Sequence, residues 1–357
     1  MTTAVRRDRP RHGRGSALLL AFAILVISAL TGCVTYVPRI PAAVPGQSGS
    51  GWHAKILKDH PLVGRVWAPS QNRFVAPARL IDAAVAADFV LLGEQHDNVD
   101  HHRIQSWVLK SLMERGKRPA VVFEMLSDDQ QVALSRFLNG NPRSAAGLGI
   151  AVGWSQTAWP NWAIYQPIAD AALMYGMPIL PGGFPRSTIS RMVRMGRSVI
   201  GESEIRALGL DVPVDAASRA TIQQAIAVGH LGVMPANVIG KIVDMQIAKD
   251  AKMARATVNA RRLTQTDSAV LIAGTGHVRS DVGVPKHLRR SGASTNVISI
   301  GLMEVKEELH RADEYVEGFP AASTLPFDFV WFTPKMGHDD EDELKERIER
   351  SVKKLSQ

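Results

Sequence analysis

The chain is poor in cysteine and in tyrosine. Cys33 is the only cysteine among 357 residues, and there are four tyrosines. A lone cysteine excludes an internal disulfide framework and a cysteine-rich metal site. The Gly-x-Ser-x-Gly turn of serine hydrolases and the His-Glu-x-x-His helix of zinc proteases are also missing from the sequence. The sequence therefore lacks the signatures of serine hydrolases with this turn and of zinc proteases with this helix.

Positive charge is scarcer than the total indicates. The formal net charge is +8, but residues 1–32 carry five arginines and one aspartate, which leaves +4 on the remainder. No segment interleaves basic and aromatic side chains in the way that nucleic-acid-binding surfaces do. We therefore expect no nucleic-acid partner.

The N-terminus has the pattern of an export signal. Five arginines precede or flank the start of an apolar run at residues 17–30, which is long enough for a signal peptide and short for a membrane span. The sequence Leu-Thr-Gly-Cys at residues 30–33 resembles the lipobox of bacterial lipoproteins. We predict a signal peptide at 1–32, lipidation of Cys33 and a Pro-, Gly- and Ser-rich tether at 33–51. An uncleaved membrane anchor is the alternative.

Short apolar runs predict the core of the fold. Five of them indicate buried strands, and a sixth indicates an edge strand; they lie at 89–92, 120–123, 178–180, 269–273, 297–300 and, for the edge strand, 327–332. Continuous apolar strands separated by helices are typical of a mostly parallel central sheet with helices on both faces. The sequence therefore predicts an α/β fold.

Helical spacing fills the intervals between these strands. We expect helices over about 100–114, 128–139 and 203–259, the last with breaks near Pro213 and Pro235. Together they predict one α/β domain at 52–335, with helical insertions at about 127–175 and 186–260 that cap the strand ends. Residues 336–357 begin acidic and end basic, which favours a charged C-terminal helix.

Acidic and histidine residues follow three of the predicted strands. Glu94 and His96 follow the first strand, Glu124 follows the second, and His277 follows the strand at 269–273. Ligands of open α/β sheets gather at the carboxyl ends of strands, so these four side chains are predicted to converge. They could hold a divalent metal, or transfer protons without one. Each could instead be a hydrogen-bonded buried group.

Accessory residues surround these four. Three glycines would let the backbone approach a ligand, an Asp or Asn could cap the following helix, and two adjacent histidines begin that helix. One of the two histidines is expected to point to solvent. This accessory set comprises Gly93, Gly274, Gly276, Asp97, Asn98, His101 and His102.

These motifs resemble those of the ChaN-like haem-binding lipoproteins, within a wider group that includes Tiki and TraB proteins and erythromycin esterases. The resemblance covers about residues 85–305. It is carried by residues 92–98 with His101 and His102, residues 123–125, residues 162–165 with Pro167, the helix positions Gln246, Asp250, Met253 and Ala254, and residues 274–277.

The resemblance implies a haem-binding lipoprotein of the cell envelope that serves iron or haem acquisition. In this family, haem can sit between two subunits and take a tyrosine ligand, so a homodimer is an expectation. No tyrosine can be assigned here: Tyr36 lies in the tether, Tyr165 in a family motif, and Tyr175 and Tyr315 in neither. A histidine, including His101 or His102, or a methionine remains open as the axial ligand.

The alternative hypothesis is a metal-dependent hydrolase of ester or peptide bonds that uses the Glu and His residues at the strand ends. Within the wider group, Tiki proteins resemble metal-dependent proteases, and the esterases use the Glu and His of their own motif in hydrolysis.

Val34 follows Cys33 in place of the aspartate associated with inner-membrane retention. We therefore expect a lipid-anchored protein at the outer membrane or facing the periplasm.

Overall fold

The computed structural model describes residues 1–2, 43–46, 51–292, 296–319, 321–337, 345–346 and 350. The predicted signal peptide, Cys33, most of the tether and nearly all of the C-terminal helix lie outside the described residues, so these remain predictions. The described residues from 43 onward belong to one compact unit. Within the described part of the chain, no helix is both long and apolar enough to cross a membrane.

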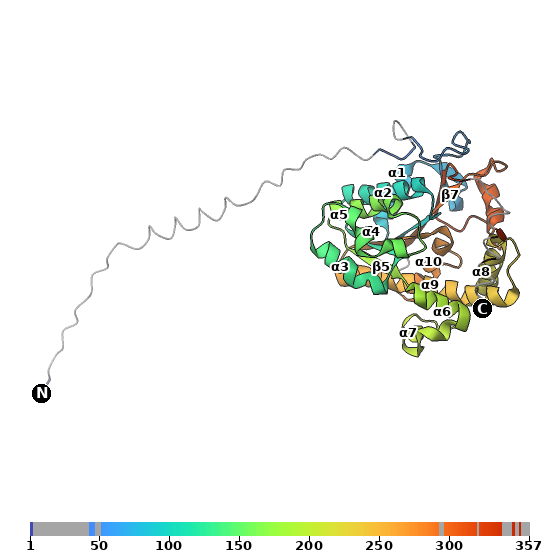
Figure 1. Cartoon of the computed structure of the whole chain (residues 1–357). Coiled ribbons are helices and arrows are strands. Elements are labelled where there is room, and N and C mark those ends of the chain that lie inside the picture. Colours follow the sequence, from blue (N-terminus) through green and yellow to red (C-terminus); the bar gives the residue numbers. More distant parts are fainter. Residues whose placement is uncertain are drawn as a thin grey trace. The chain divides into compact units, whose positions relative to one another are not determined.

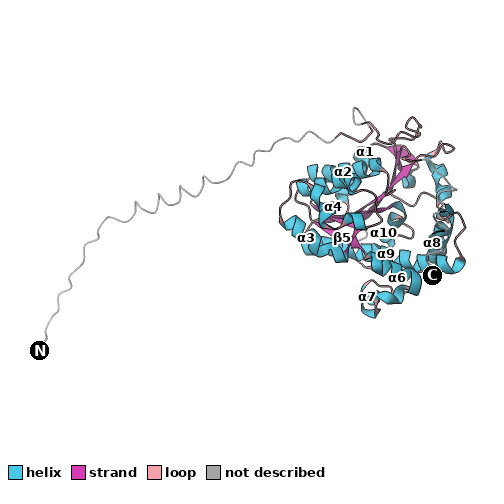
Figure 2. Cartoon of the chain, viewed as in Figure 1, coloured by secondary structure: helices cyan, strands magenta, loops and turns pink. Residues whose placement is uncertain are grey.

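A mixed sheet forms the centre of this unit (Figure 2). In the described residues it has eight strands in the order β2-β1-β8-β7-β3-β6-β4-β5, and the six from β8 to β5 are parallel. The strands are β1 (Val66–Ala68), β2 (Arg73–Val75), β3 (Phe89–Glu94), β4 (Pro119–Ser127), β5 (Ile179–Gly183), β6 (Ser268–Gly274), β7 (Val297–Glu304) and β8 (Phe329–Thr333). The five predicted buried strands and the α/β class are confirmed.

The prediction of an edge strand near the C-terminus was wrong. β8 lies inside the sheet, parallel to β7 on one side and antiparallel to β1 on the other. β1 and β2 were missed because each has only three residues, too few to show a periodicity. They cover β8 and turn an expected edge into an interior strand.

Both faces of the sheet are buried, which explains why its strands are continuously apolar. Val90 and Leu92 of β3 face one core together with α1 (Pro77–Ala86), α2 (Val99–Glu114) and α5 (Trp162–Met174). Phe89 and Leu91 face a second core together with α9 (Ala236–Thr264) and α10 (Val284–Arg290). Helices therefore flank the sheet on both sides (Figure 1).

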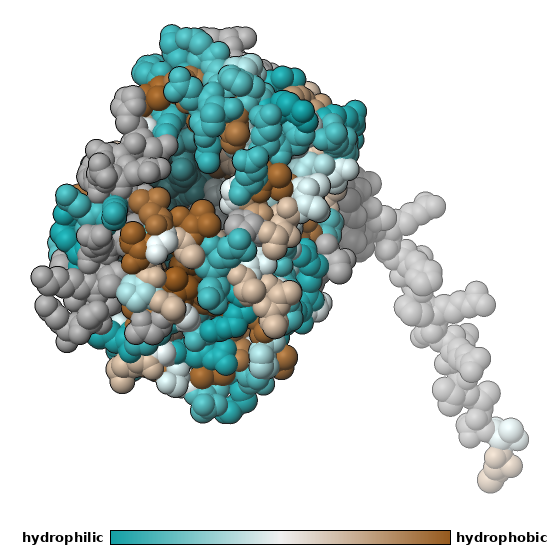
Figure 3. Space-filling view, turned by 90° about the vertical axis from the view of Figure 1, so that its right-hand side faces the viewer, coloured by the Kyte–Doolittle hydropathy of each residue, from teal (hydrophilic) through white to brown (hydrophobic). Residues whose placement is uncertain are grey.

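The two predicted insertions are helical. The first contains α3 (Gln131–Asn139), α4 (Leu148–Ala151) and α5; the second contains α6 (Arg186–Met195), α7 (Glu202–Ala207), α8 (Ala216–Gly229) and α9. Pro213 lies between α7 and α8, and Pro235 immediately precedes α9, so both expected breaks are confirmed. Apolar side chains of α6 to α9 form a third core. The side of the molecule on which α8 lies shows apolar side chains gathered beside a hollow (Figure 3).

Candidate functional site

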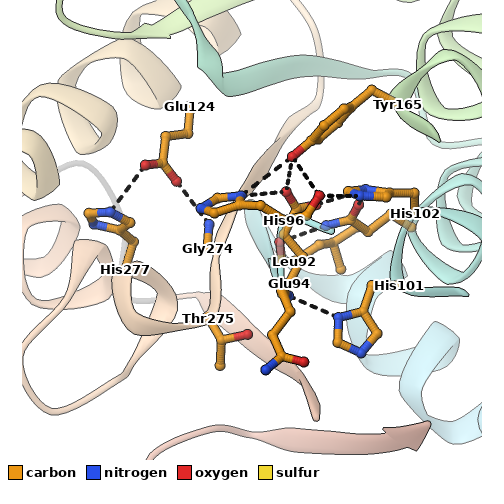
Figure 4. A network of polar contacts seen from close by, with 12 residues as sticks. Leu92, Glu94, His96, His101, His102, Glu124, Tyr165, Gly274, Thr275 and His277 are labelled. Carbon is orange, nitrogen blue, oxygen red and sulfur yellow. Dashed lines mark hydrogen bonds and ion pairs between the residues drawn. The ribbon is translucent and has the colours of Figure 1, made fainter. Parts of the chain in front are cut away.

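The four predicted residues come together because β3, β6 and β4 are adjacent parallel strands. Glu94 ends β3 and lies opposite Gly274, the last residue of β6. Glu124 lies in β4, and its Oε2 accepts a hydrogen bond from the Gly274 amide at 2.8 Å. His277 lies in the 3-10 turn Thr275–Val278 that follows β6. Figure 4 shows the resulting network, with Gly274 between its two halves.

The first half of the network is built around the buried Glu94 carboxylate. Its Oε1 lies 3.0 Å from Nδ1 of His96 and accepts a hydrogen bond from the Tyr165 hydroxyl, also at 3.0 Å. Its Oε2 lies 3.1 Å from Nδ1 of His102. Burial raises the pKa of Glu94, but the two histidines outweigh burial and hold it at about 2. Glu94 is therefore an anion at neutral pH.

His102 is the buried counter-ion of Glu94. Its Nδ1 faces Glu94 Oε2 and the Gln105 Oε1 atom at 3.2 Å, and its Nε2 faces the His96 carbonyl oxygen at 3.1 Å. Both ring nitrogens thus face acceptors, which favours the doubly protonated ring. Burial lowers the pKa of His102, but the nearby Glu94 carboxylate gives a net rise.

His96 is the histidine of the network that reaches the surface. Its side chain is 34 % exposed, and its ring packs edge-on against Trp159 with centroids 4.8 Å apart. Glu94 holds Nδ1, and a Cβ placed on Gly274 would lie 3.1 Å from Nε2. Nε2 therefore lies over Gly274, on the side of the second half of the network. From this position it can exchange a proton with a bound molecule.

The second half is a buried chain of alternating charges. Glu124 Oε1 lies 2.6 Å from Lys249 Nζ and 3.2 Å from His277 Nε2. His277 Nδ1 lies 2.5 Å from Asp250 Oδ1 and 3.0 Å from Gln246 Nε2. Burial lowers the pKa of His277, but Glu124 and Asp250 raise it to about 9 against the opposing effect of Lys249. His277 and Lys249 hold the pKa of Glu124 well below its usual value, despite its burial.

This arrangement does not support the metal hypothesis. The Lys249 ammonium lies 2.6 Å from Glu124 and 3.1 Å from His277 Nε2, so a side-chain cation already bridges two of the proposed ligands. Across the described residues, no group of three or more His, Cys, Asp or Glu side chains is arranged to hold a metal ion. What the residues offer is proton transfer between paired acids and bases.

The histidines at the start of α2 contradict the expectation that one of them points to solvent. Both are fully buried. His101 Nδ1 accepts a hydrogen bond from the Gln95 amide at 2.9 Å, so its Nε2 donates to the Thr333 hydroxyl at 2.9 Å. Burial lowers the pKa of His101 to about 3, which keeps the ring neutral. His101 is a structural residue, and His102 supports the site from behind, through Glu94 and the His96 carbonyl oxygen.

The remaining accessory residues have separate positions. Asn98 caps α2, as predicted, by accepting hydrogen bonds from the amides of residues 100 and 101. Asp97 is exposed. A Cβ on Gly93 would collide with Val278, so this glycine serves packing rather than a ligand. Gly276 has open space where a Cβ would stand and lines a cavity.

That cavity adjoins the second half of the network. It has a volume of about 230 Å³ and lies between α8, α9 and the turn after β6. Its α9 wall includes Gln246 and Asp250, whose side chains also contact His277. Its α8 wall is apolar and includes Ile222 and Ile226. The polar network and this cavity, which is apolar on its α8 side, thus share one wall.

Sequence reasoning missed the role of α9. Gln246 and Asp250 were recognised only as family positions, and Lys249 was not singled out. The available signal was the spacing: polar residues at i, i+3 and i+4 stand on a buried helix face among Ile247 and Ala251. Such a cluster predicts a polar partner opposite the helix. Tyr165 was placed in a family motif, but its bond to Glu94 joins segments 71 residues apart.

Comparison with known proteins agrees with this fold. The solved structure of ChaN of Campylobacter jejuni, which shows cofacial haem binding, is 21% identical; it covers 74% of this chain and 95% of that one, with a TM-score of 0.57. At this identity the likeness shows a shared fold. The type III effector HopBA1 (12% identity, 72% and 92% coverage, TM-score 0.40) and a mutant of the erythromycin esterase EreC (11%, 73% and 93%, 0.39) are more distant. No curated protein matches the chain.

The family model described as "Haem-binding uptake, Tiki superfamily, ChaN" matches residues 80–288. These residues include the whole polar network and the walls of the adjoining cavity. The match spans more than half of the chain, and the chain therefore belongs to the ChaN family of haem-binding uptake proteins.

Proposed function

We propose that this protein is a haem-binding lipoprotein of the cell envelope that serves haem or iron acquisition. The observation that carries the proposal is the family match over residues 80–288. The N-terminal sequence supports the location, because an arginine-rich start, an apolar run and Cys33 follow one another as in lipoprotein signals. We place the protein at the outer membrane or facing the periplasm.

The residues present fit a haem better than a bare metal ion. A porphyrin is a flat, largely apolar ring, and the cavity beside α8 is apolar on one wall. Its volume of about 230 Å³ is below the ~300–1,000 Å³ of pockets that enclose a ligand. The cavity would therefore take one edge of the ring and leave the rest at the surface, where a second copy of the chain could cover it.

A haemin titration tests the binding. The chain from Cys33 onward, with Cys33→Ser to prevent lipidation, should give a saturable change in the Soret absorbance that approaches one haem per chain. An apo-albumin competition would show whether binding is specific. A spectrum that stays that of free haemin throughout the titration would contradict the proposal.

The membrane anchor needs its own test. The native chain expressed in a Gram-negative host should incorporate radiolabelled palmitate and sediment with the envelope. Cys33→Ser should abolish both. Palmitate incorporation that persists in Cys33→Ser would reject Cys33 as the lipidated residue.

His96 favours a second candidate function, a metal-independent hydrolase. The Glu94 carboxylate contacts its Nδ1 and the side chain is 34 % exposed, which is the arrangement of a general base. The purified protein should then hydrolyse a simple activated ester, and His96→Ala should remove that activity. Equal rates for both proteins would reject this candidate and leave the haem proposal intact.

A further inference from the structure

We propose that His230 is an axial ligand of the haem iron, in the cavity between α8 and α9. The inference rests on the proposed haem binding and adds the residue that the sequence could not assign. His230 directly follows α8 as its C-cap and lines the cavity.

The hydrogen bonding of His230 prepares its ring for a metal. Nδ1 lies 2.6 Å from the backbone carbonyl oxygen of Ile226. A carbonyl only accepts, so Nδ1 carries the hydrogen, and in the neutral ring Nε2 keeps its lone pair. Histidines that ligate metals usually donate the other ring N–H to a carbonyl or carboxylate in this way. With Nδ1 turned toward α8, the Nε2 edge faces away from the helix.

The surroundings of His230 suit a macrocycle rather than a hydrated ion. Ile222, Ala225 and Ile226 line the same cavity. Val228 and Leu231, on either side of His230 in the sequence, are 56% and 38% exposed. A histidine among apolar side chains, several of them at the surface, offers one strong ligand and a flat apolar contact. The polar residues of the cavity wall are engaged elsewhere, because Gln246 and Asp250 contact His277 and Arg279 pairs with Asp281.

The turn after α8 fixes the position of the ring. Leu231 has a φ of 53° and Gly232 a φ of 67°. A branched residue is uncommon in the left-handed region, and such residues persist where surrounding bonds hold them. Here the Leu231 amide donates to the Val228 carbonyl and the Gly232 amide to the Ala227 carbonyl. The strained turn holds His230 at the end of α8.

Several other candidate ligands in the described chain are occupied or buried. The Tyr165 hydroxyl bonds to Glu94 and its side chain has no exposed surface, and Tyr315 is 5% exposed. His101 and His102 are fully buried. The Nε2 of His277 faces Glu124 and Lys249. His230 is partly exposed and lines a cavity with one apolar wall, which none of these residues does.

The test is a haemin titration of the chain from Cys33 onward carrying Cys33→Ser, read by absorbance and electron paramagnetic resonance. His230→Ala should weaken binding roughly tenfold or more and remove the signature of imidazole ligation, since the iron loses its direct protein ligand. His53→Ala, a change at an exposed histidine outside this cavity, is the matched control and should match the unmutated protein.

Two further variants separate ligation from structure. His230→Gly with added free imidazole should recover the original spectrum, whereas a merely structural histidine would not be replaced by the free ring. His230→Tyr should give the spectrum of phenolate ligation at retained helicity. If haem binds and His230→Ala leaves affinity and spectrum unchanged, this assignment is wrong and the proposed function stands. If the unmutated protein binds no haem, the proposed function fails and the assignment with it.

Discussion

The polar network and the cavity beside α8 share a wall. They differ in how many of their polar side-chain atoms already have a hydrogen-bond or ion-pair partner. In the network, Glu94, Glu124 and His277 are buried and each contacts partners of opposite charge. In the cavity, His230 uses one ring nitrogen on its own helix and turns the other away from it. The presence of charged residues at the strand ends therefore does not by itself identify the residue that binds the iron. The less conspicuous histidine is the better candidate for iron.

The same difference separates the two functions that the molecule could serve. A buried network with one partly exposed base suits proton transfer, and a cavity with one apolar wall suits a flat ligand. If the regions act independently, variants in one should leave the other unaffected. If haem binds over the network, variants of His96 would disturb both proton transfer and haem binding. The following predictions are ways to decide between these cases.

The largest effect is expected from Glu124→Leu. The change leaves the Lys249 ammonium and His277 without the carboxylate that lies 2.6 Å and 3.2 Å away. Removing one partner of a buried ion pair typically costs about 3–5 kcal/mol. Denaturant unfolding should show a loss of this size, with haem affinity of the remaining native protein unchanged.

The exposed pair Arg206–Glu202 provides the control. Both side chains are more than half exposed, so Arg206→Ala should cost about 1 kcal/mol or less. Equal losses in the two variants would mean that the network contributes no more to stability than a surface ion pair.

His96→Ala should have the next largest effect, on hydrolysis alone. General acid–base groups contribute roughly 10²–10⁴-fold in rate, so ester hydrolysis should fall by about two orders of magnitude or more. The haem titration should be unchanged, because His96 does not line the cavity that holds His230. A weakened haem affinity would place the ligand over the network and join the two regions into one site.

The sequence predicted the central fold because the strands that carry it are long and apolar. β3, β4 and β6 were identified from four or five consecutive apolar residues each, and their parallel order brought Glu94, Glu124 and His277 together. β1 and β2 escaped because three residues have no detectable period. The burial of His101 and His102 also escaped, because it depends on a contact with Thr333, more than two hundred residues away.

A pH dependence should follow from His277. Its pKa is about 9 in the folded protein against 6.5 in the unfolded chain, because it faces Glu124 and Asp250 despite the nearby Lys249. A raised pKa stabilises the fold below pH 6.5, and this contribution is lost as pH rises through about 9. Thermal unfolding should lose a few degrees over this range. His277→Gln should be less stable near neutrality and should lack this part of the slope; an unaltered slope would assign it to other groups.

The smallest effect is expected from a methyl group placed between the two halves of the network. In Gly274→Ala, the new Cβ would lie 3.1 Å from His96 Nε2 and 3.7 Å from Glu124 Oε2, so the His96 ring must shift by a few tenths of an ångström. Hydrolysis should fall several-fold, by less than in His96→Ala, with stability lowered by about 1 kcal/mol. Gly276→Ala is the matched control, because no atom stands within 4 Å of its Cβ position although the residue lines the cavity. If Gly274→Ala affects haem binding and Gly276→Ala does not, the haem lies over the network. The reverse pattern places it in the cavity beside α8.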